Sequence, residues 1–146
     1  MKKLAVIRIR GLRGIKPRIK TTLVSLGLLK VNNCIIIEDS PSYLGMLQLC
    51  KDYVAWGEVS APTVEKLIAK RGETEGKKLK DAVKEGELKD IASKFYSGEK
   101  KLEELKVQKV FRLTPPSKGY KDTKLKYPRG ASGKRPDIDS LLGRMI

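Results

Sequence analysis

Histidine is absent from the 146 residues, and cysteine occurs only twice. Because histidine is the usual general base and metal ligand near neutral pH, its absence leaves only Asp, Glu, Lys and Cys for such chemistry. Cys34 and Cys50 stand apart in apolar surroundings, without the spacing of a metal site. We expect both to be small core residues rather than ligands or a disulfide. The sequence therefore predicts no enzyme, no metal site and no cofactor.

Long apolar runs and nucleotide-binding signatures are missing as well. A membrane-spanning helix needs about 18 or more apolar residues in succession, and the sequence contains no such stretch. The apolar run near the N-terminus is short and is interrupted by arginine, so no signal peptide is predicted. The pattern GxxxxGK[ST] does not occur, which argues against a nucleotidase. We expect a cytoplasmic protein with no membrane contact and no small-molecule substrate.

Acidic residues are missing from one part of the chain. Residues 1–30 contain nine Lys or Arg and no Asp or Glu. Residues 31–108 contain 13 basic and 14 acidic residues, and residues 109–146 contain ten basic and three acidic residues. The net charge of +15 is thus concentrated at the two ends, around a neutral middle. Such segregation is typical of a surface that binds a polyanion.

The first 60 residues read as strand, helix, strand, helix, strand. The expected strands are apolar runs rich in β-branched residues, at 4–9, 34–38 and 53–59. Pro17 is suited to the first turn of a helix that Gly27 would end. Ser40 and Pro41 predict the start of a second helix, extending to about residue 52. Pattern alone would make the crossovers between these strands parallel.

The remaining residues, 61–146, read as a C-terminal extension packed on the core of residues 1–60. Narrow apolar stripes predict short helices between about 62 and 106, the last of them at 99–106. A strand is expected at 107–113. Residues 114–136 are basic and nearly devoid of aliphatic side chains, so we expect an extended segment without a core of its own. Helical spacing returns at 137–145.

The strand-to-helix turn near the N-terminus carries the first candidate site. Gly11 and Gly14 break the strand, and backbone N–H groups at a turn of this kind can approach a phosphate closely. Cations beside a helix N-terminus oppose the helix dipole, so they favour an anionic ligand over helix stability. Although the two glycines have the GxxG spacing of KH domains, they follow a strand, and a KH domain is not expected. The candidate cations are Arg8, Arg10, Arg13, Lys16, Arg18 and Lys20.

The basic segment near the C-terminus carries the second candidate site. Tyr120 and Tyr127 are interleaved with cations, a combination that can stack on unpaired bases and follow a phosphate backbone. Trp56 is expected in the core or at a strand-edge contact rather than as a platform for bases. The alternative is an adaptor that binds acidic proteins or an anionic membrane surface through its charged ends. The cations of this segment are Lys118, Lys121, Lys124, Lys126, Arg129, Lys134 and Arg135.

Several short motifs, in their order and spacing, resemble the large-subunit ribosomal protein family L-thirty. They are Ile15-Lys-Pro17, Thr21-Thr-Leu23, Leu26-Gly-Leu28, Pro41 with Gly45-Met46, Tyr53-Val54 and the ending from Gly133 to Met145. The short bacterial form would cover only about residues 3–60, whereas the whole chain is similar to the archaeal and eukaryotic branch, called L-seven in eukaryotes.

The resemblance implies an α+β fold, a ferredoxin-like β-α-β-α-β core sandwich whose sheet is antiparallel. It also implies a structural role in the large ribosomal subunit, with Lys16, Arg18 and Lys20 in the family's basic helix start. The implied partners are large-subunit ribosomal RNA and neighbouring ribosomal proteins. The extension is expected to reach further RNA, with the small ribosomal RNA of that subunit as a candidate.

Overall fold

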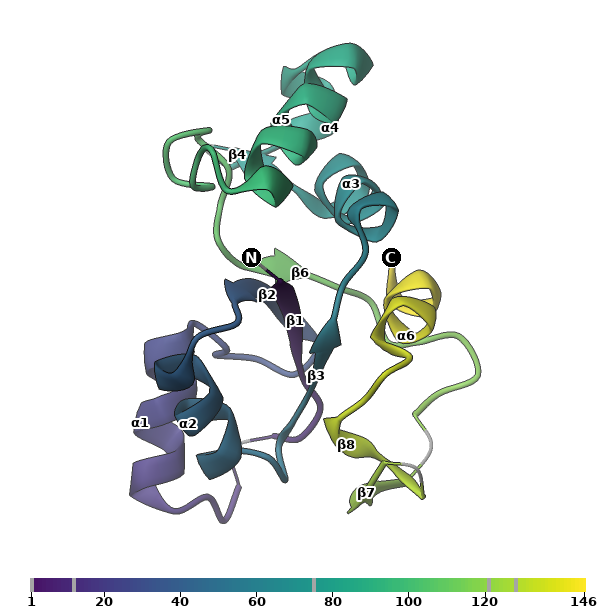
Figure 1. The fold of residues 1–146 in the computed structure, drawn as a ribbon. Helices are drawn as coiled ribbons and strands as arrows, with labels where there is room; N and C mark the ends of the chain where they lie inside the picture. The colour runs from purple at the N-terminus through teal and green to yellow at the C-terminus, as the bar shows by residue number, and fades with distance from the viewer. Residues whose placement is uncertain (1, 12, 75, 121, 128) are drawn as a thin grey trace.

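The computed structural model describes residues 2–11, 13–74, 76–120, 122–127 and 129–146, with the backbone alone for residues 122–124. A six-stranded sheet forms its centre, in the order β6-β2-β1-β3-β8-β7. Figure 1 shows the sheet between two groups of helices. The strands are β1 (Lys3–Arg8), β2 (Asn33–Glu38), β3 (Val54–Glu58), β6 (Phe111–Arg112), β7 (Asp122–Lys126) and β8 (Gly130–Lys134), and a separate ribbon pairs β4 (Glu73–Thr74) with β5 (Lys77–Lys78).

The central strand β1 is antiparallel to both of its neighbours. Ile7 lies opposite Cys34 of β2, and Arg8 lies opposite Val54 of β3. The parallel direction that pattern alone would give is therefore wrong for these three strands, and the antiparallel pairing implied by the resemblance is confirmed for them. The reason is that the loop after β1 and the helix that follows bring the chain back to the end of the sheet where β1 ends. Strand β2 therefore starts beside the last residues of β1. Strands β2 and β3 then run in the same direction on either side of β1, which is the split β-α-β arrangement of ferredoxin-like folds.

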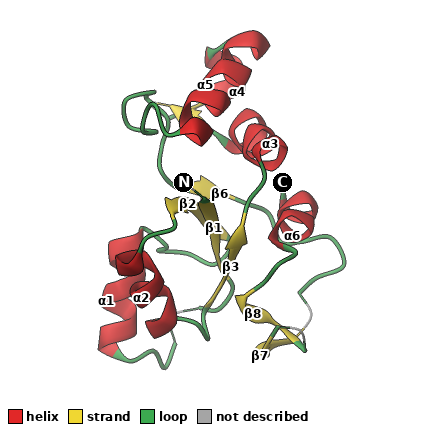
Figure 2. Cartoon of the chain, in the orientation of Figure 1, coloured by secondary structure: helices red, strands yellow, loops and turns green. Residues whose placement is uncertain are grey.

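Helices cover both faces of the sheet, as Figures 1 and 2 show. One face packs against α1 (Pro17–Leu26) and α2 (Pro41–Leu49). The other packs against α3 (Ala61–Arg71) and α6 (Ile138–Met145), and α5 (Glu85–Ser97), preceded by the short α4 (Leu79–Ala82), packs on α3. Leu4 and Val6 of β1 face the first layer, and Ala5 and Ile7 face the second. Because both faces are covered, all six residues of β1 are buried, and the four between Lys3 and Arg8 are apolar.

The predicted starts of the first two helices are confirmed. Pro17 occupies the first turn of α1, and Gly27 ends the helix with a left-handed φ of +82°. The hydroxyl of Ser40 accepts a hydrogen bond from the backbone N–H of Tyr43 at 3.4 Å, so Ser40 caps α2. Helix α2 ends at Leu49, earlier than expected. The last predicted helix, at 137–145, is found as α6.

The predictions were less accurate between residues 99 and 136. The expected helix at 99–106 is absent from the described chain, which forms turns over 102–106 and places Lys106 at a φ of +59°. Such a short segment gains too little from helix propagation to offset nucleation, and Leu102 is buried without a helix. Only Phe111–Arg112 of the expected strand at 107–113 pairs, with β2.

The second half of the basic segment is part of the sheet. Strand β8 pairs in parallel with β3, with Ala55 opposite Gly133 and Trp56 opposite Lys134. Strand β7 pairs irregularly with β8. Residues 130–133 are buried although they carry no large aliphatic side chain. Small residues and backbone hydrogen bonds take the place of a core there, which explains why aliphatic content alone predicted no packing.

Candidate nucleic-acid interface

The loop at 9–16 presents the first group of predicted cations. Arg13, Lys16, Arg18 and Lys20 are exposed, and Arg10 is half-buried. No acidic residue occupies the first turn of α1, and Lys16 at its N-cap makes no side-chain cap hydrogen bond. The first N–H groups of the helix therefore add a positive partial charge to that of the side chains.

The two glycines of this loop leave its backbone accessible. Gly14 has a φ of +70°, a conformation that side chains disfavour. A Cβ placed at either Gly11 or Gly14 would meet no described atom within 4 Å, so both are at the surface. The arrangement matches the requirement for a phosphate oxygen to reach backbone N–H groups and guanidinium forks together.

Arg8 is a correction to the predicted site. Its side chain is only 1% exposed, so it cannot belong to the cationic surface. Its Nε donates to the carbonyl oxygen of Arg10 at 2.9 Å, and its Nη1 donates to that of Leu28 at 2.6 Å. Arg8 thus ties the loop to the chain after α1. Burial lowers the pKa of the Arg8 guanidinium, against a smaller opposite influence of Cys50.

The second cationic segment reaches the same end of the sheet. Since Ala55 lies opposite Gly133, the start of β8 extends past the start of β3, where β1 ends. Lys126, Arg129 and Lys134 are exposed, and Tyr127 is 37% exposed. In Figure 1 the beginning of α1 and the strand β7 both lie on the lower side of the molecule.

Asp52 and Tyr53, in the turn before β3, connect the two segments. The Arg10 guanidinium lies over the Tyr53 ring, 5.2 Å from its centroid. The Lys126 ammonium lies 3.7 Å from an Asp52 carboxylate oxygen. Residues more than a hundred positions apart in the sequence therefore converge on one turn. We call the cations at this end of the sheet the cationic end; it consists of the half-buried Arg10 and the exposed Arg13, Lys16, Arg18, Lys20, Lys126 and Arg129.

Three predicted residues of the second segment lie elsewhere. Arg135 is 7% exposed, and its guanidinium is paired with the Asp137 carboxylate at 2.9 and 3.0 Å. Tyr120 is half-buried and donates its hydroxyl hydrogen to Asn32 Oδ1 at 2.6 Å, so it is not a free platform for bases. Lys118 is exposed in a turn whose neighbouring carbonyls, of Ser117 and Gly119, accept from Arg144. Lys121 and the side chain of Lys124 lie outside the described residues.

Sequence reasoning missed Lys51, which is exposed just after α2 and lines a small cavity together with Lys126 and Lys134. No pattern in the sequence indicates this contact, because it depends on the pairing of β8 with β3. The register of that pairing is non-local and was not foreseen.

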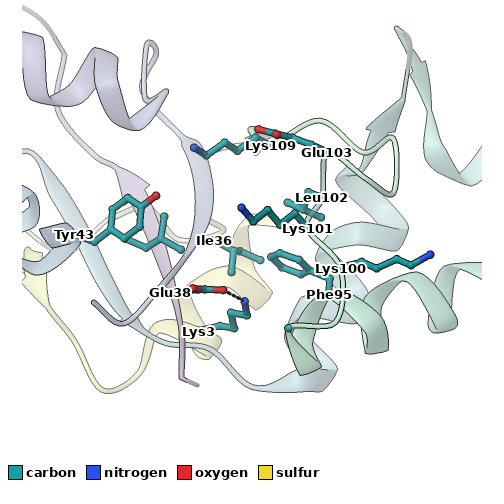
Figure 3. A pocket seen from close by; sticks show the side chains of 12 residues that line it. Lys3, Ile36, Glu38, Tyr43, Phe95, Lys100, Lys101, Leu102, Glu103 and Lys109 are labelled. Atoms are coloured by element: carbon teal, nitrogen blue, oxygen red, sulfur yellow. Dashed lines mark hydrogen bonds and ion pairs between the residues drawn. The ribbon is translucent and has the colours of Figure 1, made fainter. Parts of the chain in front are cut away.

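A larger cavity, of about 370 Å³, lies at the opposite end of the sheet (Figure 3). Its lining includes Lys3, Glu38, Tyr43 and Phe95. The Lys3 ammonium is 3.1 Å from a Glu38 carboxylate oxygen and lies over the Phe95 ring at 5.0 Å. None of the predicted site residues lines this cavity. Because its one buried cation is already paired, we assign it no small-molecule ligand.

Both cysteines are buried, as the sequence predicted. Burial raises the pKa of the Cys34 thiol to about 12 and that of Cys50 to about 11. Neither thiol is therefore a nucleophilic thiolate near neutral pH. No group of three His, Cys, Asp or Glu side chains among the described residues is arranged to hold a metal ion. No helix in the described part of the chain is long and apolar enough to cross a membrane.

Comparison with known proteins identifies the family to which this chain is similar. Residues 4–54 match the family described as "Ribosomal protein L30p/L7e". The "Large ribosomal subunit protein uL30" of Methanosphaera stadtmanae is 40% identical to this chain, over 97% of the chain and 99% of the relative. The protein of the same name from Archaeoglobus fulgidus is 43% identical, over 97% and 98%. That of Methanobrevibacter smithii is 41% identical over the same shares.

Proposed function

Because this chain belongs to the large-subunit ribosomal protein family L30p/L7e, a family of structural proteins rather than enzymes, we propose that it holds ribosomal RNA through its cationic end. In this role it is a constituent of the large ribosomal subunit and fixes the tertiary structure of the RNA without catalysing a reaction. Given this family, no observation specifically favours the alternative of an adaptor that binds acidic proteins or an anionic membrane surface.

The convergence of the two cationic segments on Asp52 and Tyr53 carries the proposal. Phosphates are spaced along an RNA strand, so a protein that binds several of them needs cations from more than one element on one surface. The turn after β1 contributes accessible backbone at Gly11 and Gly14 together with guanidinium forks, and Lys126 and Arg129 extend the charge sideways. A single cationic loop would contact fewer phosphates.

The helical part of the extension has the opposite character. Residues 61–106 are rich in both Lys and Glu, and their mixed charges attract phosphate much less than the cationic end does. We therefore propose residues 1–60 as the RNA-binding core and residues 61–146 as an extension whose last part completes the surface. Further contacts, to the small ribosomal RNA of the subunit and to neighbouring ribosomal proteins, belong to the same proposal.

Charge reversal at two separate places tests the proposal. Arg13→Glu with Arg18→Glu changes the cationic end, and Lys100→Glu with Lys101→Glu makes the same charge change on exposed residues at the far end. We expect the first pair to weaken binding to protein-free large-subunit RNA on the order of a hundredfold at moderate salt. The second pair should change it about twofold, through net charge alone. Circular dichroism confirms folding, and filter binding gives the dissociation constants. Equal losses in both pairs would contradict the proposal.

A further inference from the structure

The cavity of about 370 Å³ at the far end of the sheet runs past an edge of that sheet. On one side it is lined by Ile37 and Tyr43, which pack in the layer of α1 and α2. On the other side it is lined by Ile36 and Phe95, which pack in the layer of α3 and α6. A cavity that reaches both layers passes the edge of β2, because the strand itself separates them. Figure 3 shows Tyr43 and Phe95 on opposite sides of the cavity.

The edge of β2 is unpaired along this cavity. Strand β6 pairs with only the first two residues of β2. The backbone N–H of Asp39, just after β2, donates to the carbonyl oxygen of Lys2 at 3.1 Å, so alternate residues counted back from Asp39 bond to β1. The N–H and C=O of Ile36 and the N–H of Glu38 therefore point away from β1, and none of them bonds to a described residue. Such an edge is a template for another strand.

This edge stays open because the chain that leads into β6 is bonded elsewhere. The N–H of Gln108 donates to the carbonyl oxygen of Glu73 at 2.9 Å, which ties this part of the chain to the β4–β5 ribbon rather than to β2. Lys109 and residues 100–103 line the cavity from the extension. The cavity is thus the space left between β2 and the segment that precedes β6.

The exposed part of the lining favours an acidic partner. Lys100, Lys101 and Lys109 are exposed, and none of them forms an ion pair with a described carboxylate. The lining contains two acidic residues, and one of them, Glu38, is already paired with the buried lysine of β1. Only Glu103 remains to balance the three exposed lysines. Carboxylates brought by a partner would complement this excess of positive charge.

We propose that the open edge of β2 takes an extended acidic segment of a neighbouring protein of the large subunit as an added strand, an inference that rests on the proposed function for the source of the segment. The segment pairs its backbone with Ile36 and Glu38, packs apolar side chains on Phe95 and Leu102, and directs its carboxylates to the lysines. RNA fits this place less well, because it has no peptide groups to continue the sheet and the carboxylates of the lining repel phosphate.

Amide hydrogen exchange at the edge of β2 tests the inference. It is measured by mass spectrometry with residue-level fragmentation on the full-length protein in three states: free, bound to protein-free large-subunit RNA, and assembled into large subunits. We expect the amides of Ile36 and Glu38 to exchange at similar rates in the first two states and on the order of a hundredfold more slowly in the third. The amide of Ile37, which faces β1, is the internal control and should be protected in all three.

Charge reversal tests the acidic character of the segment. Lys101→Glu with Lys109→Glu should reduce the protection of Ile36 in assembled subunits about tenfold, or keep the protein out of the subunits while leaving its binding to protein-free RNA within about twofold. Lys66→Glu with Lys89→Glu makes the same charge change on exposed residues of α3 and α5 and should do neither. Equal effects of the two pairs would overturn the assignment of an acidic partner.

The outcomes separate this inference from the proposed function. Fast exchange of Ile36 in assembled subunits that contain the protein would overturn the added strand and leave the proposed function standing. Protection gained already on protein-free RNA would assign the edge to RNA and overturn the added strand as well. Absence of the protein from large subunits, together with no binding to their RNA, would overturn both.

Discussion

Two segments, the end of β1 with the turn after it and the C-terminal stretch from β7 to the residue after β8, each contribute one buried arginine and several exposed cations. The two arginines are held differently. Arg8 has the carbonyl oxygens of Arg10 and Leu28 as partners. Arg135 has the carboxylate of Asp137, with the ring of Tyr127 beside it. In both segments the inward arginine fixes the backbone, and the outward cations remain available to a ligand. The first attachment uses neutral acceptors, and the second uses a group that titrates.

The two segments also differ in how closely their backbones approach the sheet. The segment containing Arg135 packs its main chain directly against β3. A side chain at Gly57 would collide with the carbonyl oxygen of Arg135 and would meet Ile138 Cβ at 3.1 Å. The loop at 9–16, in contrast, has open space at both of its glycines. The C-terminal segment is thus positioned by close backbone packing, and the N-terminal turn is positioned by one side chain.

The largest effect is expected from filling the close contact at β3. Gly57→Ala should destabilise the protein by about 3 kcal/mol, because the collision involves backbone that cannot rotate away. Gly86→Ala in α5 is the matched control, since no described atom lies within 4 Å of its added Cβ. Because Gly86 lies in the first turn of α5, the change should stabilise by less than the roughly 0.5–1 kcal/mol of a mid-helix position. Urea unfolding followed by circular dichroism measures both, and equal effects would show that the chain after β8, at Arg135 and Ile138, does not pack closely on β3.

A smaller loss is expected from removing the arginine that holds the N-terminal turn. Arg8→Met keeps the volume but leaves the Leu28 and Arg10 carbonyls without their donor, which should cost about 2 kcal/mol. Arg8→Lys retains the charge but cannot donate in the same fork, so it should recover only part of the loss. Urea unfolding gives the stabilities, and trypsin cleavage after Arg13 reports loosening of the loop. Wild-type stability in Arg8→Met would mean that the two hydrogen bonds do not hold the turn.

The different roles of these arginines mark the limit of what the sequence reveals. The strands β1, β2 and β3 and the starts of α1 and α2 follow from local signals, namely β-branched runs, Pro17, Gly27 and Ser40. The inward position of Arg8 could have been inferred from the two-residue period of a strand. Arg8 lies on the same face as Leu4 and Val6, and that face is covered by helices. Its charge suggested a surface residue instead.

Non-local pairing explains the remaining differences. Residues 130–133 join the sheet through backbone bonding to β3 and small side chains, neither of which produces a hydrophobic pattern. The directions of β2 and β3 depend on where α1 returns the chain, which periodicity does not encode. For the same reason the meeting of residues 10 and 126 at Asp52 and Tyr53 could not be foreseen, although the residue types at both segments had already suggested RNA.

The smallest effect on stability is expected from low pH. Of the two arginine attachments, only that of Arg135 should weaken, because its partner is a carboxylate. The hydrogen bond from Arg135 lowers the pKa of the Asp137 carboxyl, with smaller help from the charge of Arg144. A lowered folded-state pKa stabilises the fold fully above the unfolded value of about 4, and this contribution is lost as pH falls through the folded value. Because the Asp137 side chain is 43% exposed, screening should limit it to less than about 1 kcal/mol.

The difference in unfolding free energy between wild type and Asp137→Asn isolates this contribution from the other carboxyl groups. We expect the difference at pH 6 to be small but measurable in urea titrations, and to shrink as the pH falls below about 4 and through the lowered folded-state pKa of Asp137. The same pair of measurements in an Arg8→Met background should give the same difference, because Arg8 has no titrating partner among its hydrogen bonds. A difference that persists in acid would mean that Asp137 stabilises the segment through something other than its charge.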